Sequence, residues 1–310
     1  MLTLDRVSKV YRVGTFGTQP LNAVRDVSLT VPPGAVVSLI GESGSGKSTI
    51  GRMVLRLTPV TSGAITFDGR NVAGLSGHRA RKGYYRHVQG VFQDPFSSFN
   101  PIFPVDRVFE MLRGAYFPGV SDAEWRASVR RGIERVGLDP GQVLGRYPHQ
   151  LSGGQLQRLL IARALTLDIR LLVADEIISM LDASTRIDVL NLLGDLRAEG
   201  LGILFVTHDL ALGTYVSDTT VILRRGAVAE MGPTRQVYAS PRHPYTRGLL
   251  ASVPRMHRTW AEADADLDTA VGPCPVHSGP AGPGPAGPAG PVEVGPDHFV
   301  GCFSDDACPE

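Results

Sequence analysis

Apolar and polar residues alternate along the first part of the chain, over residues 2–12 and 22–31. A period of two residues is typical of strands with one buried face, so we predict antiparallel strands there. Continuous apolar runs at 35–40, 171–175 and 202–207 indicate strands buried on both faces, as in a parallel sheet. Between the last two runs, helical spacing is kept by Ile187, Leu190, Leu193 and Leu196. Buried strands alternating with a helix predict an α/β fold.

The middle of the chain, from about residue 95 to 165, has a helical pattern. Ser121 and Glu124 have the spacing of a capping box at the start of a helix. The apolar face of that helix is expected to carry Trp125, Val129, Ile133 and Val136. We therefore predict a helical subdomain inserted between the strands.

The last part of the chain has a different composition. Of the 25 residues in 272–296, 15 are glycine or proline. Such a segment cannot bury a hydrophobic core, so we expect a Gly/Pro-rich linker within a short, largely disordered tail.

Overall composition excludes several classes of protein. With 310 residues, 43% hydrophobic content and a net charge of +1, the chain has the composition of an ordinary soluble protein and no basic surface for nucleic acid. The first residues lack the form of a signal peptide, and no uncharged apolar run approaches the ~20 residues of a membrane span. All three cysteines lie in the last 37 residues, so no disulfide framework supports the core. These features predict a cytosolic chain.

A phosphate-binding loop follows the apolar run at 35–40. It fits the pattern G-x-x-x-x-G-K-[ST], and a periodic stretch follows it, as a strand–loop–helix unit requires. Its backbone N–H groups are expected to converge on phosphate oxygens, a lysine to neutralise phosphate charge, and a serine hydroxyl to bind Mg²⁺. The loop consists of Gly41, Glu42, Ser43, Gly44, Ser45, Gly46, Lys47, Ser48 and Thr49.

A second anion site is predicted where Ser152 caps a helix that runs to about residue 165. The cap hydroxyl and the amides of Gly153 and Gly154 meet at the positive end of the helix, and Gln155 follows them. The phosphate loop and the Ser152 helix start would both bind a terminal phosphate. One chain can use both sites if two chains pair head to tail. Each nucleotide then lies between the phosphate loop of one chain and the Ser152 helix of the other.

This arrangement resembles the ATP-binding cassette (ABC) family, in which Leu-Ser-Gly-Gly-Gln at 151–155 is the signature. The resemblance covers about residues 1–250, and it implies that these form a nucleotide-binding domain with residues 251–310 as a C-terminal extension. It implies a P-loop NTPase fold of the ABC-cassette type, with a mixed core sheet, antiparallel N-terminal strands and a helical signature subdomain. ATP and Mg²⁺ are the cofactors that it implies.

Further residues acquire roles through this resemblance. Asp175 ends an apolar strand and is expected to hold Mg²⁺ through water, and Glu176 to polarise the attacking water. Adjacent acids after a strand often form only a solvated turn, but here they follow the signature helix. Gln93 matches the Q-loop, which contacts Mg²⁺ and the attacking water. His208 matches the switch histidine at the terminal phosphate, a role that depends on the resemblance alone.

Two assignments stay open at the level of sequence. Asp182 matches the D-loop, which crosses the interface between two chains, and it equally suits a helix cap; both roles are compatible. Tyr11 matches the aromatic residue that stacks on adenine, and the alternative is an ordinary aromatic residue of a sheet.

Within the family, the chain resembles ATPase subunits of oligopeptide and dipeptide importers. The resemblance is carried by residues 41–49, 93–101, 147–150 and 241–246. Ile177 and Ile178 replace the usual Pro-Val or Pro-Thr after the catalytic glutamate, and both can still pack as apolar residues. Importers of this branch also carry oligosaccharides and nickel, so those substrates are the alternatives to peptides.

The expected function is therefore that of an ATP-hydrolysing motor for import. Its partners would be integral-membrane permease subunits, a second ATP-binding subunit and, indirectly, an extracytoplasmic substrate-binding protein. It would act at the cytoplasmic face of the membrane as a peripheral protein. The rival is a soluble ABC ATPase that acts on nucleic acid or ribosomes, but such proteins usually have a long coiled coil or two cassettes in one chain.

The tail cysteines suggest one further cofactor. In this importer branch, cysteines after the His-Pro-Tyr-Thr stretch can bind an iron–sulfur cluster. Here only Cys274, Cys302 and Cys308 are present, Ala307 replaces the usual arginine, and a four-iron cluster normally takes four thiolates. We therefore expect anaerobically purified protein to be colourless.

Overall fold

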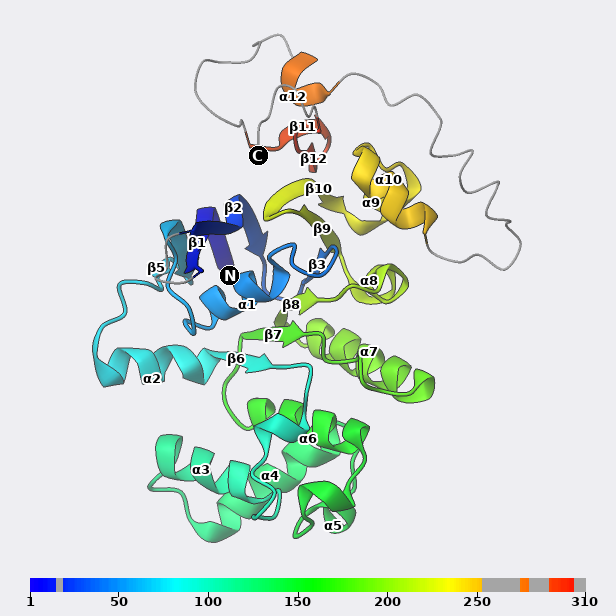
Figure 1. Ribbon diagram of the computed structural model, residues 1–310. Coiled ribbons are helices and arrows are strands. Elements are labelled where there is room, and N and C mark those ends of the chain that lie inside the picture. The colour runs from blue at the N-terminus through cyan, green and yellow to red at the C-terminus, as the bar shows by residue number, and fades with distance from the viewer. Residues whose placement is uncertain (15–18, 253–273, 279–289, 304–310) are drawn as a thin grey trace. The chain divides into compact units, whose positions relative to one another are not determined.

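The computed structural model describes residues 1–14, 19–252, 274–278 and 290–303. The chain divides into two compact units, one of residues 1–74 and 204–310 and the other of residues 75–203 (Figure 1). Each unit carries some of the predicted site residues. The boundary between the units falls within strand β8 (Gly202–Val206).

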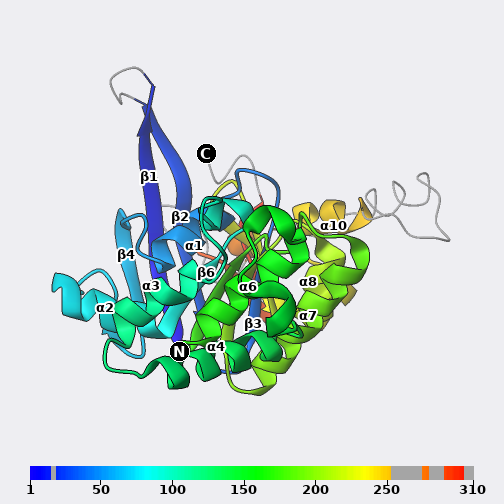
Figure 2. The same ribbon diagram turned by 90° about the horizontal axis from the view of Figure 1, so that it is seen from below.

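The first unit contains an antiparallel sheet in the order β2-β1-β4-β5. Strands β1 and β2 form the long hairpin that Figure 2 shows, as the alternating N-terminal pattern predicts. Leu2, Leu4 and Val7 of β1 are buried, with a register shift between Leu4 and Val7 that keeps them on one face, so one face of the sheet packs on the core. The strand bounds are β1 Leu2–Val13, β2 Gln19–Val31, β4 Ser62–Phe67 and β5 Arg70–Asn71.

A mixed sheet in the same unit holds the strand that leads into the phosphate loop. It runs in the order β11-β12-β10-β9-β3, with β3 and β9 parallel and the other pairs antiparallel. All five residues of β3 are buried, as expected for a strand covered on both faces. The bounds are β3 Val36–Ile40, β9 Thr219–Arg224, β10 Ala227–Pro233, β11 Val292–Gly295 and β12 His298–Val300.

Five helices complete the described part of this unit. They are α1 Lys47–Val54, α8 Leu210–Val216, α9 Thr234–Ala239, α10 Pro244–Ala251 and α12 Pro275–Ser278.

The linker predicted over residues 272–296 is wrong at both ends. Pro275–Ser278 is a short helix, and Val292–Gly295 is a strand of the β11–β12 hairpin. The hairpin continues the sheet because β12 pairs with β10, where Glu230 lies opposite Val300. Composition averages over the whole segment, whereas Val292 and Val294 alternate with Glu293 in the short stretch that forms β11. Residues 279–289 lie outside the described part of the chain.

The second unit contains the parallel strands β6 and β7 and the helices around them. Val91 of β6 lies opposite Ala174 of β7, so both strands end at one edge. The capping box of Ser121 and Glu124 is confirmed at the start of α4. The bounds are α2 Gly77–His87, β6 Val88–Val91, η1 Phe96–Ser98, α3 Arg107–Tyr116, α4 Asp122–Arg135, α5 Pro140–Val143, η2 Pro148–Gln150, α6 Gly153–Leu165, β7 Leu171–Asp175 and α7 Ala183–Ala198.

Burial follows the predicted helical faces, with one exception. The predicted face of α4 is buried throughout, at Trp125, Val129, Ile133 and the following Val136. On α7, three of the four predicted positions are buried, but Ile187 is 40% exposed. Ile187 lies in the first turns of α7, close to the exposed cap residue Asp182. The periodic pattern therefore predicted the helix but not how deeply each of its two ends is buried.

Candidate nucleotide site

The phosphate loop joins β3 to α1 in the first unit. Gly46 precedes the helix with a φ of +102°, and a β-carbon there would lie 2.4 Å from the Ala23 carbonyl oxygen. Only glycine fits this position, because another residue would meet both backbone strain and a steric clash. The glycine thereby lets the first amides of α1 face the inside of the loop, where an anion can bind.

Lys47 is almost fully buried and closes the loop on itself. Its Nζ donates to the carbonyl oxygens of Gly41 at 2.8 Å and Glu42 at 2.7 Å, and lies 3.4 Å from Ser45 Oγ. The ammonium therefore lies inside the curl of the loop. Phosphate oxygens that enter the loop would be better acceptors than these neutral carbonyls, because they carry charge.

The predicted switch histidine follows β8 in the same unit. The backbone N–H of Thr207 donates to the Leu39 carbonyl at 3.1 Å, so the chain before His208 is bonded to the strand before the loop. His208 is exposed, and Asp209 caps helix α8 directly after it. The structure thus places His208 and the phosphate loop at the same edge of the sheet.

Tyr11 is half-buried on β1, opposite Leu21. The Lys9 ammonium lies 5.0 Å from the centroid of its ring and donates to the Pro59 carbonyl at 2.8 Å. This cation–π contact occupies part of the ring surface. The stacking of adenine on Tyr11 stays a prediction.

In the second unit, two adjacent acids stand at the end of β7. Asp175 is the last residue of the strand and is 8% exposed. Glu176 follows with a φ of +52°, a left-handed conformation that is rare for residues with a β-carbon and is concentrated at functional sites. Ser179 holds the turn, because its N–H and Oγ both donate to the Glu176 carbonyl, at 3.1 and 2.9 Å. Ile177 and Ile178 are buried, so the unusual dipeptide packs as expected.

Gln93 comes two residues after β6, at the edge where β7 ends in Asp175. Its side chain is exposed. The preceding Phe92 carbonyl accepts a hydrogen bond from Gln157 Nε2 at 3.3 Å. Gln157 belongs to α6, so the helix that follows the signature also holds the chain before Gln93.

The signature begins α6 as predicted. Ser152 Oγ accepts from the Gln155 N–H at 3.2 Å, and Gln155 Oε1 accepts from the Ser152 N–H at 2.9 Å. This reciprocal box uses a lone pair of the serine oxygen, so its O–H can still donate to an anion. Gly154 is buried against α7, because a β-carbon there would lie 2.4 Å from Thr185 Cγ2.

Asp182 caps α7, which confirms one of its two predicted roles. Its carboxylate accepts from the Ser184 hydroxyl at 2.6 Å and from the Thr185 N–H and hydroxyl at 3.0 and 2.8 Å. These bonds, led by that of Ser184, hold the pKa of Asp182 well below its usual range. The side chain is therefore a fixed anion, and a contact with another chain stays a prediction.

Two of the three tail cysteines, for which an occupied cluster was not expected, lie close together. The Sγ atoms of Cys274 and Cys302 lie 3.9 Å apart, and Cys308 lies outside the described residues. Among the residues that the structure describes, no group of three or more His, Cys, Asp or Glu side chains could hold a metal. The three cysteines of the whole sequence fall short of the four thiolates that a four-iron cluster takes, so this donor set does not fit one.

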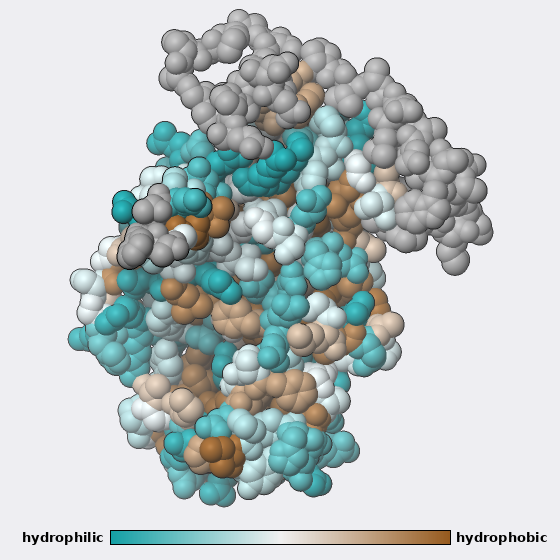
Figure 3. All heavy atoms as spheres, viewed as in Figure 1, coloured by the Kyte–Doolittle hydropathy of each residue, from teal (hydrophilic) through white to brown (hydrophobic). Residues whose placement is uncertain are grey.

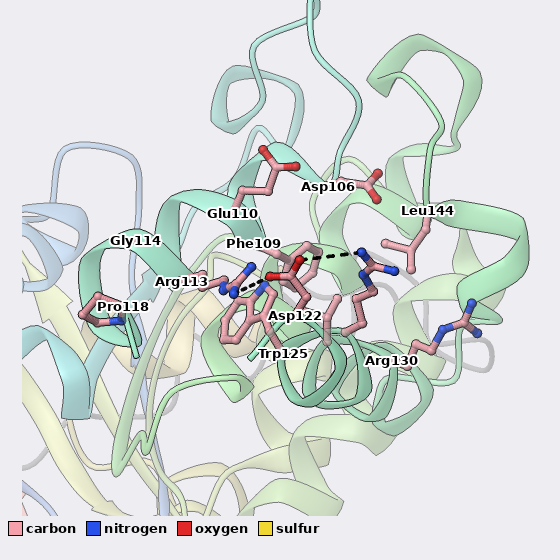
Figure 4. A pocket seen from close by; sticks show the side chains of 12 residues that line it. Asp106, Phe109, Glu110, Arg113, Gly114, Pro118, Asp122, Trp125, Arg130 and Leu144 are labelled. Carbon is pink, nitrogen blue, oxygen red and sulfur yellow. Dashed lines mark ion pairs between the residues drawn. The ribbon is translucent and has the colours of Figure 1, made fainter. Parts of the chain in front are cut away.

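A hollow of about 750 Å³ lies among α3, α4 and the chain after α5 (Figure 4). Phe109 and Trp125 contribute aromatic surface, and Asp122 pairs with Arg113 at 2.6 Å and with Arg126 at 4.0 Å. None of its lining residues belongs to a predicted motif. The hollow is therefore separate from the residues expected to bind nucleotide.

One contact with the phosphate loop was not predicted from the sequence. The hydroxyl of Tyr245 accepts a hydrogen bond from the Glu42 N–H at 3.1 Å. Tyr245 lies in the stretch 241–246, which contributed only to the resemblance with importers. Tyr245 follows Glu42 by 203 residues in the sequence, and no local pattern indicates that the two residues are in contact.

Comparisons with known proteins agree with the motifs and geometry. The family model "ABC transporter" matches residues 24–179, and the model "Oligopeptide/dipeptide transporter, C-terminal region" matches residues 229–275. The chain belongs to the ABC transporter family as an ATP-binding subunit, and its enzymatic activity is that of an ABC ATPase. Its C-terminal part is of the oligopeptide/dipeptide transporter type.

Two relatives illustrate the similarity. A protein of Brucella ovis named for peptide import and ATP binding is 44% identical over 236 residues, which cover 76% of this chain and 73% of that protein. The glutathione import ATP-binding protein GsiA of Salmonella paratyphi A is 43% identical over 247 residues, which cover 78% of this chain and 39% of GsiA.

Solved structures confirm the cassette fold. A dimeric ATP-binding cassette in a post-hydrolysis state, bound to ADP and Pi, superposes with a TM-score of 0.68 at 29% identity, covering 76% of this chain and 99% of that one. The protein cbiO1 of Clostridium perfringens, part of an ABC transporter complex, gives 0.66 at 25% identity, covering 77% and 90%. Within the described residues, no helix is both long and apolar enough to cross a membrane.

Proposed function

We propose that this chain powers the import of peptides through a membrane permease by binding and hydrolysing ATP. The observation that carries the proposal is the presence, in one chain, of a complete set of cassette motifs and an oligopeptide/dipeptide transporter C-terminal region. Residues 1–250 would form the nucleotide-binding domain and residues 251–310 its extension. Oligosaccharides and nickel remain the alternative substrates.

ATP would bind between two chains. The phosphate loop around Lys47 would hold the phosphates of one nucleotide, and the capped helix at Ser152 of a second chain would face its terminal phosphate. Two features support this division: both sites are helix starts, where the positive end of the helix attracts an anion, and a similar cassette is dimeric. The second chain would be either another copy or a sister subunit.

The oxygen ligands for Mg²⁺ would come from Ser48, Gln93 and, through water, Asp175. Hydroxyl, amide and carboxylate oxygens suit this hard cation, which neutralises charge on the phosphates when bound. Glu176 would accept a proton from the attacking water, and His208 would donate to the terminal phosphate. The turn held by Ser179 fixes the backbone that carries the glutamate.

The permease would contact the helical part of the second unit. Exposed apolar surface marks sites of protein association, and Figure 3 shows such patches around helices α3 and α4. In and before this region, the exposed apolar side chains include Phe96, Ile102, Phe103 and Met111. Docking there would hold the chain at the cytoplasmic face of the membrane.

Complementation between two inactive variants tests the shared site. Lys47→Ala removes the phosphate loop's charge, and Ser152→Arg blocks the signature helix. If one nucleotide needs both chains, each variant alone should be inactive, while a mixture should regain up to about half of the activity per dimer, because one composite site is intact. As a control, the doubly substituted chain should not rescue either variant. A mixture as inactive as its components would contradict a site shared between two copies of this chain, and the same pair of substitutions would then be divided between this chain and its sister subunit.

The substrate is tested separately, in vesicles that contain the permease and the subunits encoded beside this chain. Peptide-loaded binding protein should increase ATP turnover, whereas oligosaccharide or nickel should not. Stimulation by either of those alone would replace peptides with that substrate and leave the ATPase assignment intact.

A further inference from the structure

The C-terminal region contacts the phosphate loop through the side chain of Tyr245. Tyr245 is the second residue of α10, within the segment matched by the oligopeptide/dipeptide transporter model. Its hydroxyl accepts the hydrogen bond of the Glu42 N–H at 3.1 Å. We propose that Tyr245 is a positioning residue of the nucleotide site, which fixes the first peptide group of the phosphate loop for binding ATP.

Tyr245 bonds to the peptide group between Gly41 and Glu42, which also contacts Lys47. The Glu42 N–H and the Gly41 carbonyl belong to the same planar peptide group. Lys47 Nζ donates to that carbonyl at 2.8 Å, while Tyr245 accepts from the N–H. The peptide plane is therefore held at both ends, and its orientation helps to determine where the lysine ammonium rests inside the loop.

Tyr245 is itself held firmly. Its ring packs against a buried apolar cluster that includes Ile40, the last residue of β3 before the loop. The Arg224 guanidinium lies over the ring, 5.4 Å from its centroid. The Tyr245 N–H donates to His243 Nδ1 at 3.0 Å, and the His243 N–H donates to the buried carboxylate of Glu230 at 2.9 Å. The hydroxyl is thus placed by a fixed framework.

The protonation state of the phenol suits this role. Burial raises the pKa of Tyr245 above its ordinary value, so the group stays neutral at physiological pH. A neutral phenol can accept the Glu42 N–H without placing a negative charge beside the phosphates. A carboxylate at this position would accept the same bond but repel the nucleotide.

Two tyrosine-to-phenylalanine variants test the proposal. Tyr245→Phe removes the bond to the loop and keeps the ring. Tyr238→Phe is the matched control: Tyr238 packs on the same cluster, and its hydroxyl donates to the Leu210 carbonyl at 2.9 Å instead of to the loop. The measurements are KM and kcat for ATP, the Kd of Mg-ATP in the Glu176→Gln background, and the melting temperature.

Tyr245→Phe loses the bond from the Glu42 N–H and the hydrogen bond with the Glu42 side chain. Their loss should raise KM and Kd for ATP about three- to tenfold, with kcat changed less than about twofold. Tyr238→Phe should lower the melting temperature at least as much and leave KM within about 1.5-fold of wild type. Unchanged KM in Tyr245→Phe, or equal KM shifts in both variants, would overturn the proposal.

The inference rests on the phosphate-binding role of the loop but not on the transported substrate. Wild-type protein that failed to bind ATP would contradict the loop's role itself. Wild-type binding with an unaltered Tyr245→Phe variant would contradict only the role of Tyr245.

Discussion

Substitution of the last loop glycine offers a direct test of the loop geometry. In Gly46→Ala, the new β-carbon would lie 2.4 Å from the Ala23 carbonyl oxygen and 3.3 Å from Val24 Cγ2. An ordinary carbon–oxygen contact is about 3.3 Å, so either β2 or the loop must move by about 1 Å. Gly44→Ala is a matched control, because Gly44 also has a positive φ, +82°, but nothing lies within 4 Å of its β-carbon position.

The two variants separate backbone strain from steric clash. An alanine in a left-handed conformation costs about 1–2 kcal/mol, and this term is common to both. Overpacking against the β2 backbone adds about 1–3 kcal/mol in Gly46→Ala alone. We expect a loss of about 1 kcal/mol in Gly44→Ala and about 3 kcal/mol in Gly46→Ala. At ~2–4 °C per kcal/mol, the melting temperatures should fall by about 3 and 9 °C.

The assay is urea and thermal unfolding of the nucleotide-free chain, followed by circular dichroism. The m-value is the slope of the free energy of unfolding against urea concentration, and a changed m-value would mean that the unfolding transition itself differs. The midpoints of the variants are therefore compared only where their m-values are equal. Equal losses of stability in the two variants would refute the reasoning, because the close approach of Ala23 would then have no energetic effect.

Three further predictions concern the other parts of the site. Glu176→Gln should keep ATP binding while hydrolysis falls by about 10² or more, whereas Lys47→Ala should lose binding itself; equal turnover in wild type and Glu176→Gln would remove the glutamate from the mechanism. Ser152→Ala should cost about 1 kcal/mol in unfolding experiments and abolish turnover, while Ser121→Ala, which removes the same capping box from α4, should cost as much and leave turnover intact. Burial lowers the pKa of His243 to about 4, so the unfolded chain binds the proton more readily. Stability should therefore be complete above pH ~6.5 and fall by on the order of 3 kcal/mol as the pH drops towards 4. His243→Asn keeps a cap for α10 and should flatten this profile in acid titrations of the melting temperature; an unchanged slope would contradict the assignment.

Local patterns in the sequence predicted the strands that lead into the candidate site and the cap residues of two helices. The strand at 171–175 was predicted at its observed bounds, because a buried strand is a continuous apolar run. The caps at Ser121 and Ser152 were predicted because a capping box depends on residues only three positions apart. The phosphate loop is likewise recognisable locally, since its glycines and lysine have fixed spacing.

What the sequence could not determine depends on contacts between distant segments. The β11–β12 hairpin forms where composition predicted a linker, because a neighbouring strand edge and the buried Glu230 provide partners for β12 and His298. The bond from Glu42 to Tyr245 joins residues 203 positions apart, and no periodicity encodes it. Local chemistry therefore determined which segments could bind phosphate, and only tertiary packing decided that the C-terminal region would hold the loop.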